Sequence, residues 1–259
     1  MRAAFDAWLA ASVAHHGAGL EFREIRKGVQ ALSSLYVERR EGADLAARAL
    51  EGRGKRAAAA TAYAPLHFLT VHHALSQIGV DRFGTVRVVH DLGCGTGASG
   101  AAAALAFATR PRICGIDRSG FLLAEARRTW AAFGLAARAR RGRLPEALPR
   151  PAGGELWLLG WAVNELAERA RDALLEAVAA ALRTGAALLL LEPLAGPVTP
   201  WWPAWVQALA PRGVEERLLK VPVDLPEWLA RLDAAAGLDH SVLGARVLAG
   251  PLVAETAAA

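Results

Sequence analysis

Apolar residues recur at helical spacing throughout the first 80 residues of the chain. One stripe covers 5–13 and a second covers 22–36, where charged residues stand between the apolar ones. We expect a third helix over 43–51 and a fourth over 65–78, with a proline in the first turn of the fourth. Strand-like alternation is absent from this part of the sequence. Residues 1–82 are therefore predicted to form an N-terminal all-helical lobe.

The pattern changes at residue 86, where short β-rich runs begin to alternate with amphipathic helices. This alternation predicts an α/β fold with a doubly wound, mostly parallel sheet over residues 83–259. Two of the runs, "LWLLGW" and "ALLLLE", are apolar throughout, as parallel strands buried on both faces should be. The predicted strands are 86–91, 112–116, 136–140, 155–160, 186–192 and 242–249, and the predicted helices are 98–109, 119–133, 165–183 and 226–236.

The composition predicts a folded chain that does not span a membrane. Hydrophobic residues make up 54% of the sequence, yet the longest apolar runs, such as 185–193, are far shorter than the roughly 20 residues that cross a bilayer. Asp6 and Trp8 interrupt the apolar N-terminus, so we do not expect a signal peptide. Two cysteines in so long a chain make no disulfide framework, which favours a reducing, cytoplasmic location.

The spacing of possible metal ligands along the chain predicts no metal site. The seven histidines and two cysteines form no CxxC or HExxH pattern. His72 and His73 are adjacent, but neighbouring side chains on a helix diverge by about 100°.

The run "HDLGCGTGASG" at 90–100 follows the first predicted strand, where a parallel sheet presents backbone amides to a ligand. Glycines suit this turn because they allow positive φ and close approach of a ligand. Two patterns overlap here. Gly93, Gly95 and Gly97 with the preceding Asp91 give D-x-G-x-G-x-G, whereas Gly95, Gly97 and Gly100 fit the G-x-G-x-x-G of dinucleotide enzymes.

Asp91 distinguishes between the two patterns. An acid directly before the turn lies badly against a pyrophosphate, because two negative groups would share a corner of low dielectric constant. It suits a ligand that carries an ammonium group. The next predicted strand ends in a second acid, Asp117, whose carboxylate can accept hydrogen bonds from both hydroxyls of a ribose. Asp117 could equally cap the helix predicted at 119–133.

With its glycine loop and the acid after the second strand, the segment resembles the class I S-adenosylmethionine-dependent methyltransferases. The resemblance implies that Asp91 orients the methionine amino group and that Asp117 holds the ribose. It implies that the loop from Gly93 to Gly97 lines the methionine and ribose. Cys94 would contribute its backbone rather than its sulfur. Further cofactor contacts are expected from Arg118, Leu144 and Trp161.

A closer resemblance extends over most of the chain. The segments "IRKGVQALSSLYVERR", "AAAATAYAPLHFLTVHHAL", "GWAVNEL" and "LLLLEPLAGP" follow one another as in the methyltransferase-like family associated with the small ribosomal subunit. Members of that family usually carry a cysteine set for an iron–sulfur cluster or zinc. Cys94 and Cys114 cannot supply four ligands, so this chain departs from the family there.

Candidate catalytic residues follow the fourth and fifth strands. In-line methyl transfer depends mainly on orientation and desolvation, and a base is needed only for a poorly ionised nucleophile. The candidates are Asn164, Glu165 and Glu192, although Glu165 could simply be an acid at a helix start. Candidate substrate contacts are Trp201 and Trp202, beyond the fifth strand, and Tyr63 and His67, one helical turn apart. Each could instead pack in the core.

Three alternatives for the function stay open: methylation of RNA, methylation of a small molecule, or binding of the cofactor without catalysis. The net charge of +5 and the basic clusters at 51–56 and 137–143, with the family resemblance, favour ribosomal or other RNA. The tryptophans favour a small aromatic or other metabolite. A non-catalytic assembly factor that binds the cofactor is the third. The absence of a D/N-P-P-Y/F tetrad at 158–166 argues against amino-methylation of DNA bases or glutamine. The oligomeric state is not predicted.

Overall fold

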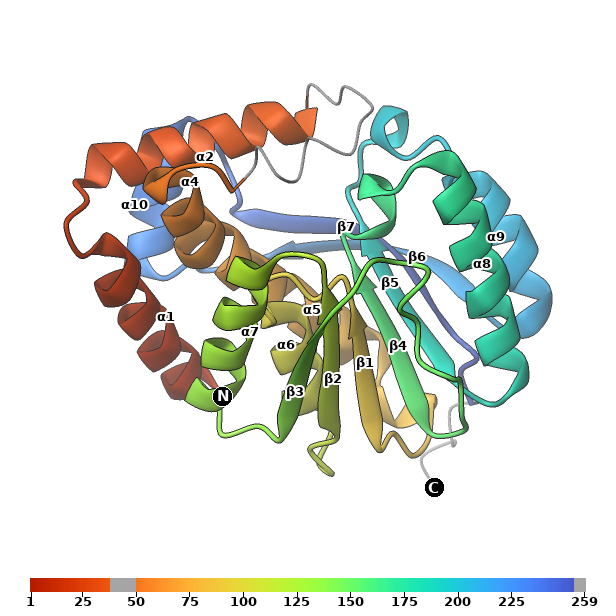
Figure 1. The fold of residues 1–259 in the computed structure, drawn as a ribbon. Helices are drawn as coiled ribbons and strands as arrows, with labels where there is room; N and C mark the ends of the chain where they lie inside the picture. The colour runs from red at the N-terminus through yellow and green to blue at the C-terminus, as the bar shows by residue number, and fades with distance from the viewer. Residues whose placement is uncertain (38–49, 254–259) are drawn as a thin grey trace.

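The computed structural model describes residues 1–37 and 50–253. Its centre is a seven-stranded sheet of order β3-β2-β1-β4-β5-β7-β6, in which β1 to β5 are parallel and β7 is antiparallel to both of its neighbours (Figure 1). The strands are β1 (Val88–Leu92), β2 (Arg112–Asp117), β3 (Ala137–Arg141), β4 (Glu155–Gly160), β5 (Ala187–Glu192), β6 (Glu215–Pro222) and β7 (Val242–Gly250). The predicted doubly wound, mostly parallel sheet is confirmed.

Helices cover both faces of this sheet (Figure 1). The α-helices are α1 (Arg2–Gly17), α2 (Phe22–Val37), α4 (Arg53–Ala58), α5 (Ala64–Ile78), α6 (Ala98–Ala106), α7 (Gly120–Ala132), α8 (Glu168–Arg183), α9 (Trp202–Leu209) and α10 (Glu227–Ala236). Short 3-10 helices are η2 (Val80–Phe83), η3 (Val163–Glu165), η4 (Gly196–Val198) and η5 (Ala210–Arg212), and η1 (Ala59–Tyr63) is a π-helical turn. Within the described ranges, every helix is too short or too polar to cross a bilayer.

Three helix predictions need correction. The helix expected over 98–109 ends at Ala106, because Phe107 has extended backbone. The helix expected to begin at Pro65 begins at Arg53 instead, because the π-helical turn η1 joins α4 to α5 without a break. A proline lacks the backbone donor of a regular turn, and a π-helical turn directly before it accommodates that loss. The helix expected over 165–183 begins only at Glu168, because Leu166 and Ala167 have extended backbone.

Other segments fell outside these expectations. Of the predicted third helix, 43–49 lies outside the described residues, and Leu50 and Glu51 are not helical. Strand β6 was not predicted, since its sequence "EERLLKVP" is charged and lies at the sheet edge with Leu218 64% exposed. The remaining predicted strands agree with the structure to within about two residues at each end.

The helices of the N-terminal region share a core with the sheet. Phe5 and Trp8 of α1 and Phe68 of α5 form a ring cluster with Phe133, which follows α7. This cluster belongs to the same buried core as residues of β1, β4, β5 and β7. A second core, with Trp157 in it, lies on the opposite face beneath α8 and α9, and a third joins α2, α4 and α10. The division into units at residue 82 stays a prediction.

Candidate functional site

The glycine loop runs from the end of β1 into α6 and is held against β2 by its backbone. The N–H groups of Gly93 and Cys94 both donate to the Ile116 carbonyl, at 2.9 Å. Gly93, Gly95 and Gly97 all have positive φ, a region that side chains disfavour. A Cβ atom on Gly93 would lie 2.6 Å from the Cβ of Ala162, which follows β4. Only glycine therefore fits where the β4 loop passes over this turn.

Asp91, in β1, is buried beneath the first turn of α6. Its side chain is 1% exposed and its Oδ2 accepts a hydrogen bond of 3.0 Å from the Gly100 N–H. Burial raises the pKa of Asp91 to about 7, although the Gly100 N–H opposes the rise. A Cβ atom on Gly100 would lie 2.5 Å from Oδ2, so the carboxylate needs glycine there. The overlapping G-x-G-x-x-G pattern thus has a structural cause.

Asp117 ends β2 and lies directly beside the loop. Its Oδ2 accepts from the Gly95 N–H at 3.0 Å, and its Oδ1 accepts from the Ser119 N–H at 2.7 Å. Burial raises the pKa of Asp117, and these two N–H groups lower it again. The N-cap of α7 is Ser119, whose hydroxyl accepts from the Leu122 N–H, and not Asp117. A Cβ atom on Gly95 would meet nothing within 4 Å, so this side of the loop is open beside Asp117.

The Cys94 side chain points away from this open side. It is 5% exposed, and its Sγ lies 3.0 Å from the place that a Cβ on Gly115 would occupy. Burial raises the pKa of the Cys94 thiol well above its ordinary value. A neutral, buried thiol is a poor nucleophile, so Cys94 serves the loop through its backbone N–H.

The segment after β4 brings the N-terminal helices to the loop. Trp161 has φ +56°, its N–H donates to the Leu191 carbonyl at 2.9 Å, and its ring stacks on His67 of α5 at 3.9 Å and 9°. Desolvation, with a smaller contribution from the charge of His240, lowers the pKa of His67 to about 3, so the ring is neutral. Trp161 and His67, predicted separately for cofactor and substrate, therefore form one aromatic pair.

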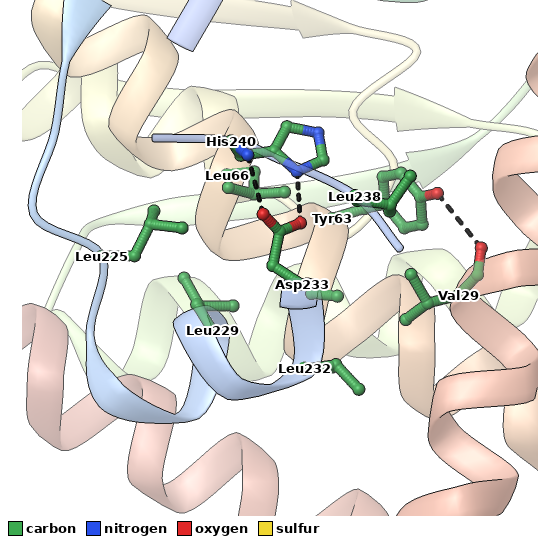
Figure 2. Close-up of a pocket in the computed structure, with 10 residues that line it drawn as sticks. Val29, Tyr63, Leu66, Leu225, Leu229, Leu232, Asp233, Leu238 and His240 are labelled. Carbon is green, nitrogen blue, oxygen red and sulfur yellow. Dashed lines mark hydrogen bonds and ion pairs between the residues drawn. The ribbon is translucent and has the colours of Figure 1, made fainter. Parts of the chain in front are cut away.

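Tyr63 lies one turn before His67 and faces a small cavity of about 10 Å³, room for about one water molecule (Figure 2). Its hydroxyl donates to the Val29 carbonyl at 3.3 Å, and burial raises the pKa of Tyr63 to about 12. Asp233 and His240 line the same cavity and are joined at 2.5 Å between Oδ1 and Nδ1. Sequence reasoning missed this pair, because its members come from α10 and the loop before β7.

Asn164 links the ends of β4 and β5. Its backbone N–H donates to Oε1 of Glu192 at 3.1 Å, and its Oδ1 accepts from the Trp201 indole N–H at 3.3 Å. Within the described part of the chain, its buried Nδ2 has no hydrogen-bond partner. A buried amide donor without an acceptor is costly, and its natural complement is an oxygen of a bound molecule. Glu192 itself is 0% exposed.

The other predicted residues divide between the site and the core. Glu165 is exposed and ends η3, while the acid in the first turn of α8 is Glu168. Trp202 is 1% exposed and its indole N–H donates to Glu216, so core packing covers the ring predicted to contact substrate. Trp201 is only half-buried. Leu144 lies near the loop, since a Cβ atom on Gly93 would be 3.8 Å from its Cδ1. The backbone carbonyl of Arg118 accepts a hydrogen bond from Arg141.

Comparison with known proteins places these features in context. Residues 89–185 match the family described as a methyltransferase domain. No curated protein matches the chain. Solved structures similar to it include the methyltransferase domain of the bacterial protein CtHen1-C, with 15% identity, a TM-score of 0.47 and coverage of 71% of this chain and 96% of that one.

Two further solved structures are similar at the same level. The YcgJ protein from Bacillus subtilis has 15% identity, a TM-score of 0.45 and coverage of 71% of this chain and 99% of that one. The precorrin-6y C5,15-methyltransferase from Geobacter metallireducens has 16% identity, a TM-score of 0.45 and coverage of 68% and 85%. The matched region 89–185 contains the glycine loop and both acids. The match of residues 89–185 to the methyltransferase domain family supports an S-adenosylmethionine-dependent methyltransferase.

Proposed function

We propose that the protein binds S-adenosylmethionine on the open side of the glycine loop and transfers its methyl group to RNA. The proposal that this cofactor binds here depends mainly on one observation: the Asp117 carboxylate contacts the glycine loop by accepting from the Gly95 N–H. A carboxylate has about four acceptor sites, so Asp117 can keep its two backbone N–H donors and accept from ribose hydroxyls as well. Arg118 and Leu144 would border the adenine.

Asp91 would face the ammonium group of the cofactor. A pKa of about 7 leaves a buried carboxylate only partly ionised in the empty protein. An opposite charge nearby favours the ionised form. Binding of an ammonium group would therefore lower the pKa of Asp91 and hold the carboxylate charged.

The acceptor would approach from the side of Asn164 and Trp201. Bound S-adenosylmethionine would supply the methyl group there, and the proton of the acceptor atom would pass to solvent or a base. The free Nδ2 of Asn164 can hold an acceptor oxygen, and the half-exposed face of Trp201 can stack on a base. Asn164 is then a positioning residue, and Glu192 fixes its backbone.

The arginines of β3 favour RNA as the acceptor. This strand forms one edge of the sheet and pairs with β2, which ends at Asp117. Arg138, Arg140 and Arg141 are exposed, and β3 pairs with β2 up to the register Asp117↔Arg141. Charges on an edge strand also prevent sheet-to-sheet aggregation, so this row has a second explanation. The resemblance to the family of the small ribosomal subunit supports the RNA alternative, and a cytoplasmic location fits it.

Calorimetry tests the cofactor part. Wild-type protein should bind S-adenosylmethionine and not NAD, and Asp117→Ala should weaken binding at least tenfold because the ribose loses its acceptor. The exposed Asp172→Ala on α8 is the matched control and should bind as the wild type does. Binding of NAD with no binding of S-adenosylmethionine would overturn the proposal.

Salt-dependent binding tests the acceptor. Ribosomal RNA fragments should bind with an affinity that falls steeply between 50 and 200 mM salt, roughly as in other phosphate contacts. Arg140→Gln with Arg141→Gln should reduce the salt slope by about 1–2, whereas Arg169→Gln with Arg183→Gln on the exposed face of α8 should not. Methylation of a small aromatic molecule without RNA binding would support the metabolite alternative, and cofactor binding without turnover on RNA or metabolite would support an assembly factor.

A further inference from the structure

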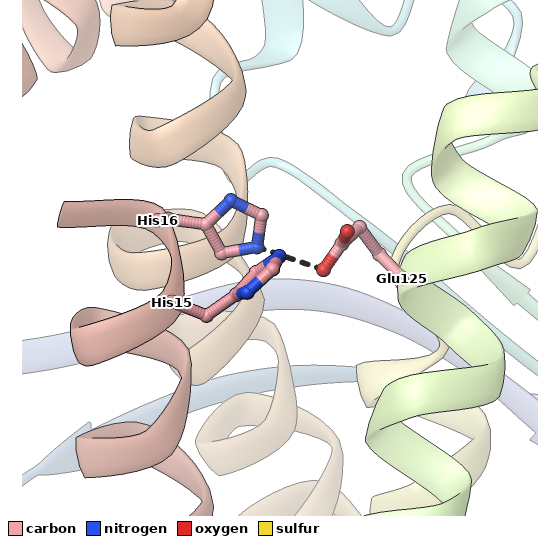
Figure 3. Close-up of side chains that lie close together, drawn as sticks. All are labelled: His15, His16 and Glu125. Atoms are coloured by element: carbon pink, nitrogen blue, oxygen red, sulfur yellow. Dashed lines mark hydrogen bonds and ion pairs between the residues drawn. The ribbon is translucent and has the colours of Figure 1, made fainter. Parts of the chain in front are cut away.

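Three possible metal ligands meet between α1 and α7. His15 and His16 lie in the last turn of α1, Glu125 lies in the middle of α7, and their ligand atoms are all within 4.8 Å of one another (Figure 3). Among the described residues, no other group of three such side chains converges in this way. His16 and Glu125 are 109 residues apart, so the spacing along the sequence could not reveal them.

We propose that His15, His16 and Glu125 bind a divalent transition-metal ion of the zinc class. Two imidazoles and one carboxylate, with water in a fourth position, form a common zinc donor set. Zinc lies about 2.0–2.1 Å from nitrogen and oxygen ligands, so tetrahedral ligands are about 3.3 Å apart. Nε2 of His16 and Oε2 of Glu125 are 2.8 Å apart, and the whole cluster is within 4.8 Å. Shifts of about 1 Å or less therefore complete the site.

The surroundings favour a cation in two ways. Glu125 is 7% exposed, and a carboxylate buried so deeply needs a positive partner. The two histidines also lie in the last turn of α1, where the helix dipole is negative. An imidazolium ion of His16 could satisfy Glu125 by itself. It would not explain why the ring of His15 lies 4.7 Å from that of His16, edge to face, beside the same carboxylate.

A cavity of about 230 Å³ adjoins the cluster and has room for the fourth ligand. His15, His16 and Glu125 line it together with Ser12, Thr96 and Thr129. Three protein ligands with a fourth position open to water are typical of reactive rather than closed zinc sites. Thr96 belongs to the glycine loop, so the site and the loop share one cavity.

Arg128 is the group that opposes a cation here. Its NH1 contacts Nε2 of His15, and its Nε lies 4.0 Å from Oε1 of Glu125. The Arg128 side chain is 54% exposed and long enough to turn into solvent when an ion binds. Removal of this charge should therefore tighten metal binding. A plain ion pair between His16 and Glu125, without a metal site, does not predict this change.

The test uses the full chain with no affinity tag, stripped of metal by a chelator and titrated with ZnCl₂ in a calorimeter. Wild-type protein should bind one ion per chain. His16→Ala and Glu125→Gln should each weaken binding more than about 100-fold, because loss of a direct ligand exceeds the 10–100-fold effect of an outer-shell partner. Arg128→Gln should bind severalfold more tightly. His72→Ala with His73→Ala, an adjacent pair outside the cluster, should leave binding unchanged.

Cobalt absorption on the wild-type protein gives a readout that needs no variant to fold. An intense four-coordinate visible spectrum is expected, displaced by ZnCl₂. No ion taken up, a weak six-coordinate spectrum, or equal binding by wild type and Glu125→Gln, with circular dichroism confirming the fold, would overturn the proposal. None of these measurements involves S-adenosylmethionine, so failure here leaves the proposed function untouched.

Discussion

Replacing Asp91 by asparagine removes one ionisable group and keeps both the side-chain volume and an acceptor for the Gly100 N–H. Burial raises the pKa of Asp91 from 3.8 to about 7 in the folded protein, so between these values the folded state holds a proton that the unfolded state releases. Stability from this group is fully present below pH 3.8 and is lost as the pH rises through about 7. At about 1.4 kcal/mol per pH unit, the loss is about 4 kcal/mol.

Urea unfolding at several pH values, without cofactor, measures this loss. From pH 4 to pH 8 the free energy of unfolding of Asp91→Asn should rise relative to wild type by about 4 kcal/mol, and the difference should stay level at higher pH. Asp6→Asn is the control, because Asp6 is exposed on α1. Parallel curves for wild type and Asp91→Asn would refute the reasoning, since they would show that Asp91 does not change its proton binding on folding.

Three further predictions concern the loop and its cover. Gly97→Ala should lower the free energy of unfolding by about 2–4 kcal/mol, because φ is +76° and a Cβ atom would lie 2.8 Å from Trp130 Nε1. Gly95→Ala has open space around it and should lose only about 1–2 kcal/mol in the same urea experiment. Cys94→Ala should bind S-adenosylmethionine within about threefold of wild type by calorimetry, since its thiol is buried and neutral; a larger loss would show that the sulfur matters. His67→Phe should leave the pH dependence of cofactor binding between pH 5 and 8 unchanged, because His67 is already neutral there, and an altered profile would contradict its assigned pKa of about 3.

The sequence predicted those parts of the fold that a local pattern determines. The apolar runs of β4 and β5 and the glycine loop with Asp91 could be located because burial on both faces and positive φ each restrict residue choice locally. Strand β6 could not, since an edge strand needs no apolar face of its own.

Contacts between distant segments escaped prediction for a different reason. The stack of His67 on Trp161, the Asp233–His240 pair and the meeting of His16 with Glu125 each join residues far apart in the chain. Their geometry arises only from packing of the helices against the sheet. Trp202 shows the converse: its sequence context suggested a substrate contact, but its ring is buried and its indole N–H donates to Glu216 of the edge strand β6.

The core shared by α1, α5 and the sheet constrains the order in which the protein can fold during synthesis. The ribosome makes Phe5, Trp8 and Phe68 before any strand exists, and the buried core to which they belong includes Val247 in the last strand. Contacts of such long sequence separation close late. Part of the apolar surface of the first helices therefore stays uncovered until nearly the whole chain has emerged, and during this interval the nascent protein is prone to aggregation and depends most on chaperones.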